Sequence, residues 1–419
     1  MPMSCPDTLV LRIDKMIQGG LGLARHEGQA CLVKNAIAGE LVGARVERCH
    51  SQYLEASAVD ILEPSPERVQ PPCPLYGECG GCHLQHMSYP GQLAAKTQAI
   101  EDCLCRIGKF NAARIPEPIA SPAQLNYRIR ASLKASLSPE TVIGLYQGRS
   151  HSLVAIERCL LLHEQLNACL PLLLALYREK PPVKARVQFI DLLLCRQSGT
   201  VLLRAWSGPR KDRVFALDPA HGTLTPCPRG CADSVADLRF TRTPDAFCQV
   251  NPAQNEAMIT LVLEMLAPAS GSRILELYCG SGNFSLFLAR QGADVFGIEQ
   301  NPAAVQQARA HALDNRISGC RFEAADAGTV RLDTLPFNCT DVLVNPPRNG
   351  CTQAAIRGII RLRPAAIVYV SCNPATLARD ARLLCKGGYV MDRIQPLDMF
   401  PQTCHIETVV KFVRSPQEP

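Results

Sequence analysis

Hydrophobic and polar residues alternate in four short runs near the start of the chain, at 10–13, 29–33, 41–46 and 56–61. A period of two is typical of strands with one buried face, and glycines such as Gly39 separate the runs. The pattern predicts a small β-barrel, a fold that commonly binds nucleic acid. The next stretch, residues 63–74, contains five prolines and predicts a linker.

The last third of the chain has a different pattern, in which apolar runs alternate with amphipathic stretches. This order predicts a Rossmann-like sheet with helices on both faces. A helix is predicted at 252–266, and strands are predicted within 272–285 and at 293–298, 320–322, 340–344, 367–370 and 408–412.

Between these regions, strand-like and helix-like segments are mixed. The sequence therefore predicts an α/β protein in three parts. These are a small β-barrel at 1–62, a central α/β domain at 63–242 and a Rossmann-like domain at 243–419.

One cysteine lies between an apolar run and the predicted start of a helix. The run 367–370 predicts a strand, Asn373 is a good N-cap, and Pro374 suits the first turn. Backbone amides and the helix dipole at such a position lower the pKa of a thiol. Cys372 is therefore predicted to be a thiolate nucleophile, against the alternative of a small apolar residue that ends a core strand.

A glycine turn lies between the first predicted strand of this domain and the next helix. It contains Gly280 and Gly282 but lacks the third glycine that a dinucleotide requires. The turn therefore favours S-adenosylmethionine, a nucleoside without phosphate. Glu299, at the tip of the next strand, can accept hydrogen bonds from ribose hydroxyls. Asp326 follows the third strand and supports the same interpretation.

Further polar groups follow or precede the predicted strands. Asn345 is followed by two prolines, which fix the backbone and hold its side chain beside the predicted cofactor pocket. His405 and Glu407 lie on one face of the segment that leads into the last strand. Because this strand is expected beside the one that ends at Cys372, Glu407 is predicted to be an acid or base, with His405 as the next candidate.

Three cysteines with intervening glycines form a different kind of motif, at Cys73, Cys79 and Cys82. Glycines let the backbone wrap closely around a metal, and this spacing indicates a metal site. Cys159 is a distant candidate for the fourth ligand. Spacing alone leaves zinc and an iron–sulfur centre open. The alternative is abundance, because the chain has 21 cysteines.

Charge and composition add limited information. Lys and Arg number 44 and Asp and Glu 38, which gives a net charge of +6 that is compatible with RNA without deciding it. The chain has neither a signal-peptide pattern nor an apolar run long enough to span a membrane, so a cytoplasmic protein with reduced thiols is expected.

Basic residues outnumber acidic residues seven to two between positions 106 and 149. Tyr127 and Tyr146 are interleaved with them, which predicts a face that binds single-stranded RNA, against the alternative of a solvated sheet face. The seven basic residues are Arg106, Lys109, Arg114, Arg128, Arg130, Lys134 and Arg149.

Together these motifs resemble the RNA uracil-5-methyltransferases that carry an iron–sulfur cluster, most closely the bacterial members that modify 23S ribosomal RNA. The resemblance covers nearly the whole chain. It rests on the three-cysteine motif, the glycine turn, and residues 247–251, 345–348, 371–380 and 400–407.

The resemblance implies a role for each candidate residue. Cys372 would be the nucleophile that adds to carbon 6 of uracil, and Glu407 would remove the carbon-5 proton. A 4Fe-4S cluster would be held by Cys73, Cys79, Cys82 and Cys159. The binding sites for S-adenosylmethionine and uracil would be lined by Gln249, Tyr278, Asn283, Glu299, Asp326 and Asn345.

The resemblance also implies partners and a target. The N-terminal barrel would be a TRAM-like RNA-binding module, and the substrate 23S ribosomal RNA before full subunit assembly. A monomer without DNA or membrane partners is expected. Asn345 stands where most ribosomal-type relatives have aspartate, and Ala38 stands where the TRAM module usually has proline.

Several alternatives to this target and activity remain open. They are another ribosomal uridine, the transfer RNA T-loop, an amine methyltransferase and a non-catalytic iron–sulfur RNA-binding protein. The last two fit poorly with the presence of Cys372 and Glu407.

Overall fold

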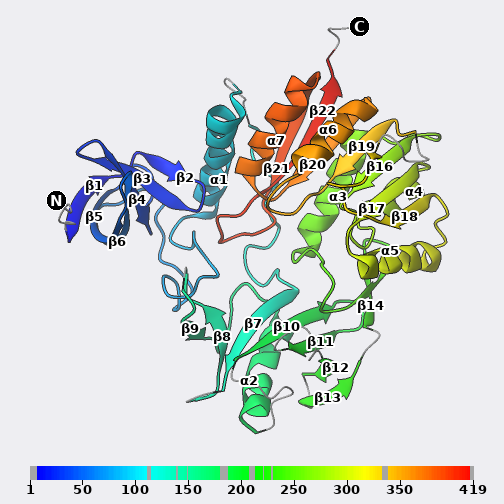
Figure 1. Cartoon of the computed structure of the whole chain (residues 1–419). Coiled ribbons are helices and arrows are strands. Elements are labelled where there is room, and N and C mark those ends of the chain that lie inside the picture. Colours follow the sequence, from blue (N-terminus) through cyan, green and yellow to red (C-terminus); the bar gives the residue numbers. More distant parts are fainter. Residues whose placement is uncertain are drawn as a thin grey trace.

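The computed structural model describes residues 7–110, 115–137, 140–148, 150–179, 187–206, 213–219, 221–227, 230–332 and 338–415. Strands in these ranges form three large sheets and one hairpin. Figure 1 shows the N-terminal sheet in blue, the central sheet in cyan and green, and the C-terminal sheet in yellow-green to red.

The N-terminal sheet has the strand order β1-β5-β6-β4-β3-β2. Alternate side chains of β1 are buried, as the sequence pattern predicted, and Leu9 and Leu11 enter a common core with Val33 and Val42. The strands are β1 (Thr8–Arg12), β2 (Lys15–Ile17), β3 (Leu21–His26), β4 (Gln29–Lys34), β5 (Leu41–Cys49) and β6 (Tyr53–Glu63).

A buried carboxylate joins this sheet to the linker that follows it. Glu40 is fully buried and accepts hydrogen bonds from the amides of Ile37, at 2.8 Å, and Ser65, at 3.1 Å. The guanidinium of Arg68 pairs with the same carboxylate at 2.5 and 2.7 Å. The charge is therefore compensated, and the proline-rich segment is held against the sheet.

Helix α1 (Tyr89–Cys103) follows the cysteine motif and ends in a short π-helical turn, η1 (Leu104–Gly108). The Ser88 hydroxyl caps its first turn by accepting from the amide of Gly91. The helix packs against β2 on one side and α7 (Pro374–Lys386) on the other. Figure 1 shows it between the N-terminal sheet and the C-terminal domain.

The central sheet is antiparallel throughout, in the order β13-β12-β11-β10-β7-β8-β9. One face packs on helix α2 through residues such as Leu170, Leu173 and Leu192. The elements are β7 (Arg130–Ser136), β8 (Val142–Tyr146), β9 (Leu153–Ala155), α2 (Glu164–Glu179), β10 (Val187–Cys195), β11 (Thr200–Trp206), β12 (Arg213–Asp218), β13 (Thr223–Pro226) and the hairpin β14 (Cys231–Val235) and β15 (Leu238–Arg242).

The C-terminal sheet has the order β18-β17-β16-β19-β20-β22-β21. The first five strands are parallel, and β22 runs antiparallel to β20. The elements are α3 (Pro252–Leu266), β16 (Arg273–Leu277), α4 (Ser285–Arg290), β17 (Asp294–Glu299), α5 (Pro302–Asp314), β18 (Cys320–Ala324), β19 (Asp341–Val344), α6 (Gln353–Leu362), β20 (Ala366–Ser371), α7, β21 (Tyr389–Leu397) and β22 (Glu407–Arg414).

The sequence patterns located these elements closely. The predicted helix at 252–266 has the bounds of α3, and each predicted strand overlaps an observed one. Several ends differ by a few residues; for example, β22 begins at Glu407 and β18 extends to Ala324. Among the described residues, the helices are too short or too polar to cross a membrane.

Candidate active site

The carboxyl ends of the parallel strands place the predicted site residues along one edge of the C-terminal sheet. Tyr278 follows β16, Glu299 ends β17, Asp326 follows β18, Asn345 follows β19 and Cys372 follows β20. Ligands of open α/β sheets bind at this edge, where the strand order reverses between β16 and β19. The topology therefore explains how residues almost a hundred positions apart meet.

The glycine turn has the backbone shape that the sequence predicted. Gly280 and Gly282 have φ angles of +55° and +89°, and Tyr278 also lies in the left-handed region, at +63°. The Glu299 carboxylate accepts from the amide of Gly280 at 3.1 Å and from the amide of Asn301 at 2.9 Å. These bonds fix the carboxylate beside the turn.

Two other predicted cofactor residues are held by local hydrogen bonds. The Asn283 amide exchanges two hydrogen bonds with Asn255 of α3, at 2.9 and 3.1 Å. Asp326 accepts from the amide of Gly328 at 2.8 Å. Gln249 lies half-buried in the segment before α3.

Cys372 and Glu407 meet because β20 and β22 are paired. Ser371 lies opposite Thr408. Cys372, which follows Ser371, and Glu407, which precedes Thr408, therefore lie at the same edge of the sheet. Burial, and then the negative charge of Glu407, raise the pKa of the Cys372 thiol to about 11, although Arg348 opposes this.

The predicted lowering of this thiol pKa is therefore wrong for the protein without its substrates. The helix does begin where the sequence predicted, since the amide of Ala375 in its first turn donates to the Asn373 side chain at 3.1 Å. Desolvation and a neighbouring carboxylate outweigh the helix dipole.

Glu407 is a buried carboxyl group at the first position of β22, with 5% of its surface exposed. Burial raises its pKa to about 8, and the positive charge of Arg348 acts in the opposite direction. Since a pKa of about 8 is close to neutral, this group can both take and release a proton under physiological conditions.

Arg348 is the cation that both groups share. It is exposed, and its guanidinium donates to Nδ1 of His405 at 3.1 Å. Its backbone carbonyl accepts from the Asn373 side chain at 3.0 Å, which joins the loop after β19 to the start of α7. Arg348 therefore favours the anionic forms of Cys372 and Glu407.

His405 lies in the loop before β22 rather than on a strand face. Burial, followed by the charge of Arg348, lowers its pKa to about 4. At neutral pH the ring is therefore neutral and accepts the hydrogen bond from Arg348. A base with this pKa is weaker than Glu407, so the geometry ranks Glu407 first.

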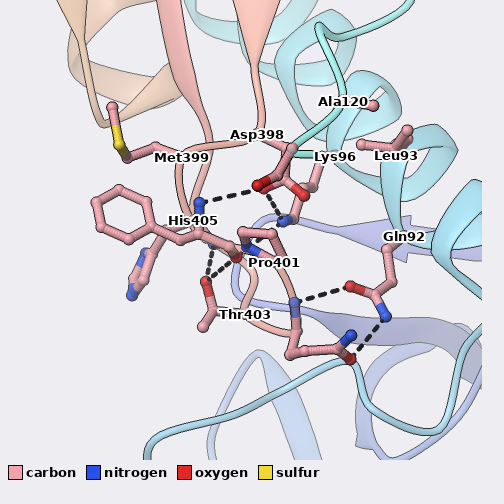
Figure 2. A network of polar contacts seen from close by, with 12 residues as sticks. Gln92, Leu93, Lys96, Ala120, Asp398, Met399, Pro401, Thr403 and His405 are labelled. Carbon is pink, nitrogen blue, oxygen red and sulfur yellow. Dashed lines mark hydrogen bonds and ion pairs between the residues drawn. The ribbon is translucent and has the colours of Figure 1, made fainter. Parts of the chain in front are cut away.

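The loop that carries His405, residues 398–406, is held by side chains of α1, as Figure 2 shows. The Lys96 ammonium pairs with Asp398 at 2.6 Å, both groups are almost fully buried, and Lys96 also donates to the carbonyl of Phe400 at 3.1 Å. The side chains of Gln92 and Gln402 form a second link: the Gln92 amide group donates to the Gln402 side chain at 2.9 Å and accepts from the Gln402 backbone amide at 2.9 Å.

The cysteine motif reaches the same loop. The backbone amides of His83 and Leu84 both donate to the carbonyl of Gln402, at 3.0 and 3.1 Å. The His83 and His405 rings meet edge to face, with centroids 5.8 Å apart. His83, which follows Cys82, is therefore in contact with His405, which lies two positions before Glu407.

Sequence reasoning missed this support. The sequence signal that could have revealed it is a pair of polar residues, Gln92 and Lys96, four positions apart. They lie on a helix face shared with the buried Leu93 and Ile100.

The four predicted metal ligands line one cavity of about 440 Å³. Burial raises the pKa of Cys82 to about 12, and the charges of Cys159, Cys79 and Cys73 add to this effect. The four thiols are thus close enough to interact electrostatically. Within the described ranges, no group of three or more His, Cys, Asp or Glu side chains has the spacing to hold a metal ion directly.

Polar side chains fix the backbone around this cavity. Gln85 accepts from the amide of Cys73 at 3.2 Å, and Asn167 of α2 exchanges hydrogen bonds with the backbone of Cys159 at 2.9 and 3.0 Å. A Cβ atom at Gly80 would lie 2.8 Å from the carbonyl oxygen of Tyr146. The glycine is therefore required for the close approach of the motif to the central sheet.

The predicted RNA-binding face needs a correction at two residues. Tyr127 is buried, and its hydroxyl donates to the carbonyl of Pro401 at 3.0 Å, so it supports the loop and cannot stack on a base. Arg130 donates to the carbonyls of Pro244 and Ala246. Arg114 and Arg149 lie outside the described residues.

Two family models match the chain. A model described as tRNA (uracil-5-)-methyltransferase matches residues 233–415, and a model of the TRAM domain matches residues 9–59.

The chain is also similar to whole proteins. A 23S rRNA (uracil(1939)-C(5))-methyltransferase RlmD of Azoarcus sp. strain BH72 is 36% identical, with 96% of this chain and 99% of that one covered. The RlmD of Pseudomonas putida KT2440 is 35% identical, covering 96% and 93%.

One solved structure is similar over the whole chain. It is the tRNA (uracil-54, C5)-methyltransferase of Pyrococcus abyssi in complex with S-adenosyl-L-homocysteine, 25% identical with a TM-score of 0.74, covering 96% of this chain and all of that one.

Proposed function

Because this chain belongs to the RNA uracil-5-methyltransferase family, we propose that it methylates carbon 5 of the 23S ribosomal RNA uridine that its RlmD relatives modify. S-adenosylmethionine is the methyl donor. The observation that carries the proposal is the meeting of Cys372, Glu407 and Arg348 at the sheet edge that also carries the glycine turn.

The chemistry begins at the nucleophile. Carbon 5 of uracil is a poor nucleophile, so the Cys372 sulfur first bonds to carbon 6, and its proton passes to solvent. The electrons of the carbon 5–carbon 6 double bond move to the carbon-4 oxygen as an enolate. Arg348 offsets the negative charge of the thiolate as it forms.

The second half of the reaction needs a base. S-adenosylmethionine supplies an electrophilic methyl group, which bonds to carbon 5 as its bond to sulfur breaks. Glu407 then takes the remaining proton from carbon 5, the double bond re-forms, and the bond between Cys372 and carbon 6 breaks. A carboxyl group with a pKa of about 8 is well matched to this step.

The cofactor side of the site is assigned to the residues at the strand ends. Glu299, which accepts from the amide of Gly280, is assigned to the ribose hydroxyls, and Tyr278, Asn283 and Asp326 are assigned to the rest of the cofactor. Gln249 and Asn345 are assigned to the uracil edge, where side-chain amides can donate to carbonyl oxygens and accept from the ring N–H.

The cysteine cavity is assigned to a 4Fe-4S cluster held by Cys73, Cys79, Cys82 and Cys159. All four thiols line one cavity of about 440 Å³, which supports a shared metal group at this place, and the family resemblance favours the cluster over one zinc ion. Such a cluster with four thiolates is anionic. The cavity is also lined by Arg128, Arg130 and Arg158, whose charge complements it.

The target is chosen by similarity. The identity to the RlmD proteins is 35–36%, against 25% for the tRNA enzyme, which favours ribosomal RNA over the transfer RNA T-loop.

The remaining assignments follow from this target. We assign 1–62 to a TRAM-like RNA-binding part, 63–242 to the cluster-binding part and 243–419 to the methyltransferase part. We also assign the protein as a cytoplasmic monomer. It acts before subunit assembly is complete, because the target base must be flipped out of accessible RNA.

The test separates the two catalytic roles with 23S RNA fragments and S-adenosylmethionine labelled in the methyl group. Cys372→Ala is expected to form neither covalent adduct nor 5-methyluridine. Glu407→Gln is expected to accumulate a labelled RNA–protein adduct that survives denaturing electrophoresis. Cys385→Ala, a half-buried cysteine on α7, is the matched control and should turn over normally. Normal methylation by Cys372→Ala would refute the mechanism.

A further inference from the structure

The face of the central sheet that points away from α2 carries a row of aromatic and basic side chains. Phe189 of β10 lies opposite Trp206 of β11 and opposite Lys134 of β7. The Phe189 and Trp206 rings are stacked, with centroids 4.2 Å apart and planes 16° from parallel. All three residues are half-buried, and the neighbouring Ser132 on the same face is exposed.

Basic groups lie against the rings at each end of the row. The Lys134 ammonium is 4.4 Å from the Phe189 ring centroid and 5.9 Å from that of Tyr146 on β8. The Arg204 guanidinium is 5.2 Å from the Trp206 ring. Cations beside aromatic faces are what a single nucleic acid strand needs, because bases stack on the rings and phosphates pair with the cations.

A buried carboxylate orients the tryptophan. Asp191 accepts from the indole N–H of Trp206 at 3.1 Å and from the Ser132 hydroxyl at 2.6 Å, and lies 3.5 Å from Arg204. Its charge is thus compensated within the row and does not repel a phosphate. The ring is held in one orientation before any ligand binds, which lowers the entropy cost of stacking.

The row is connected to the segment that enters the active site. Arg130, on the same face of β7 as Lys134, donates to the carbonyls of Pro244 and Ala246 at 2.8 and 2.5 Å. The chain then continues to Asn251, whose side chain donates to the carbonyl of Met399, within the loop 398–406.

We propose that this row, defined by Lys134, Phe189, Trp206 and Arg204, binds a single-stranded segment of the RNA substrate by base stacking. This inference rests on the proposed function, because it takes the partner to be RNA. The alternative is ordinary cross-strand packing on a solvated sheet, which would leave the ring surroundings unchanged when RNA binds.

The chain contains one tryptophan, so its fluorescence reports directly on this surface. We expect the fluorescence of the iron-loaded protein to be quenched by single-stranded oligouridylate of about 12 nucleotides, a length within the usual site size. Quenching should weaken with salt. Unchanged fluorescence while anisotropy of labelled RNA shows binding would overturn the proposal. Equal quenching by a duplex of the same length would also overturn it, because paired bases cannot stack on the ring.

Two variants measure the contribution of stacking. Trp206→Ala should raise the Kd for the single strand about ten-fold, since one base stack is worth about 1.4 kcal/mol. Trp206→Phe keeps a ring and should stay within about two-fold of the wild type. Equal affinity of all three proteins, with unchanged thermal unfolding, would refute the row as an RNA surface.

The methylation assay separates this inference from the proposed function. If the Cys372 adduct forms normally but the tryptophan is not quenched, the enzyme assignment stands and the row does not bind RNA. If quenching occurs but the wild type makes no 5-methyluridine and Glu407→Gln accumulates no adduct, the RNA surface stands and the proposed reaction falls.

Discussion

The protein contains two sites built on half-buried thiols, and the charges around them differ. Cys372 is one thiol, with the carboxyl group of Glu407 and the cation of Arg348 beside it. The cavity of the cysteine motif contains four thiols, and the charges of the other three add to the raised pKa of Cys82. In both sites burial is the largest cause of the raised pKa.

The difference shows what each site requires before it can contain thiolates. In the proposed reaction Cys372 carries one negative charge for part of the cycle, and the charge of Arg348 partly opposes the rise of its pKa. In the cavity, four thiolates would repel one another at low dielectric, and under the proposed assignment bound metal cations compensate them together with the arginines of the lining. The proposed functions use this difference, since one site would form and break a covalent bond and the other would hold a metal group.

The largest expected effect comes from exchanging one thiol in each site. Cys79→Ser should lose bound iron and the brown colour of the anaerobically purified protein, because one thiolate ligand is removed. Cys372→Ser should retain iron and colour but lose methylation by at least about 10³-fold. Iron analysis and absorption spectra of both variants provide the measurement. Colourless wild-type protein with one zinc per chain would contradict the assignment of the cavity.

The next effect concerns the loop between the two sites. Lys96→Met leaves Asp398 buried without its partner and should lower the free energy of unfolding by about 3–5 kcal/mol. The double variant Lys96→Met with Asp398→Leu should recover most of this loss, because no charge remains buried. Urea unfolding of the iron-loaded proteins measures both.

Kinetic measurements on the same variants separate an effect on the position of the loop 398–406 from an effect on the stability of the protein. The double variant should still have a reduced kcat with KM for RNA little changed, because the carbonyl of Phe400 loses the hydrogen bond from Lys96. Full activity in a double variant of normal stability would show that the pair acts through folding alone.

The two sites also differ in how far the sequence could predict them. Strand and helix patterns located the ends of β16 to β20, and the rule that ligands bind at carboxyl ends placed Glu299, Asn345 and Cys372 at one edge. The pairing of Lys96 with Asp398 spans 302 positions, and no local pattern contains that information.

Electrostatics and side-chain burial were harder to predict than topology. The thiol pKa at Cys372 was predicted in the wrong direction, because the sequence shows the helix start but not the depth of burial or the distance to Glu407. Tyr127 was placed on the RNA face, yet it precedes β7 and its ring points into the protein. The sequence named four thiols as candidate ligands, whereas only the fold shows that they line one cavity.

The smallest expected effect sharpens the role of Arg348. Once methyl has been transferred, breakdown of the adduct depends on Glu407 as a carboxylate. With its pKa raised to about 8, this group is mostly protonated at pH 6, so the breakdown rate should rise about ten-fold per pH unit and level off above pH 8. Since Arg348 lowers this pKa, Arg348→Gln should move the midpoint upward by about one unit.

Arg348→Lys is the matched control, because it keeps the positive charge and should keep the midpoint near pH 8. Rapid-quench measurement of labelled adduct at a series of pH values gives the rates for all three proteins. The thiol is bonded to uracil during this step, so its own pKa of about 11 cannot contribute. A midpoint that stays at pH 8 in Arg348→Gln would mean that the cation acts on Cys372 alone.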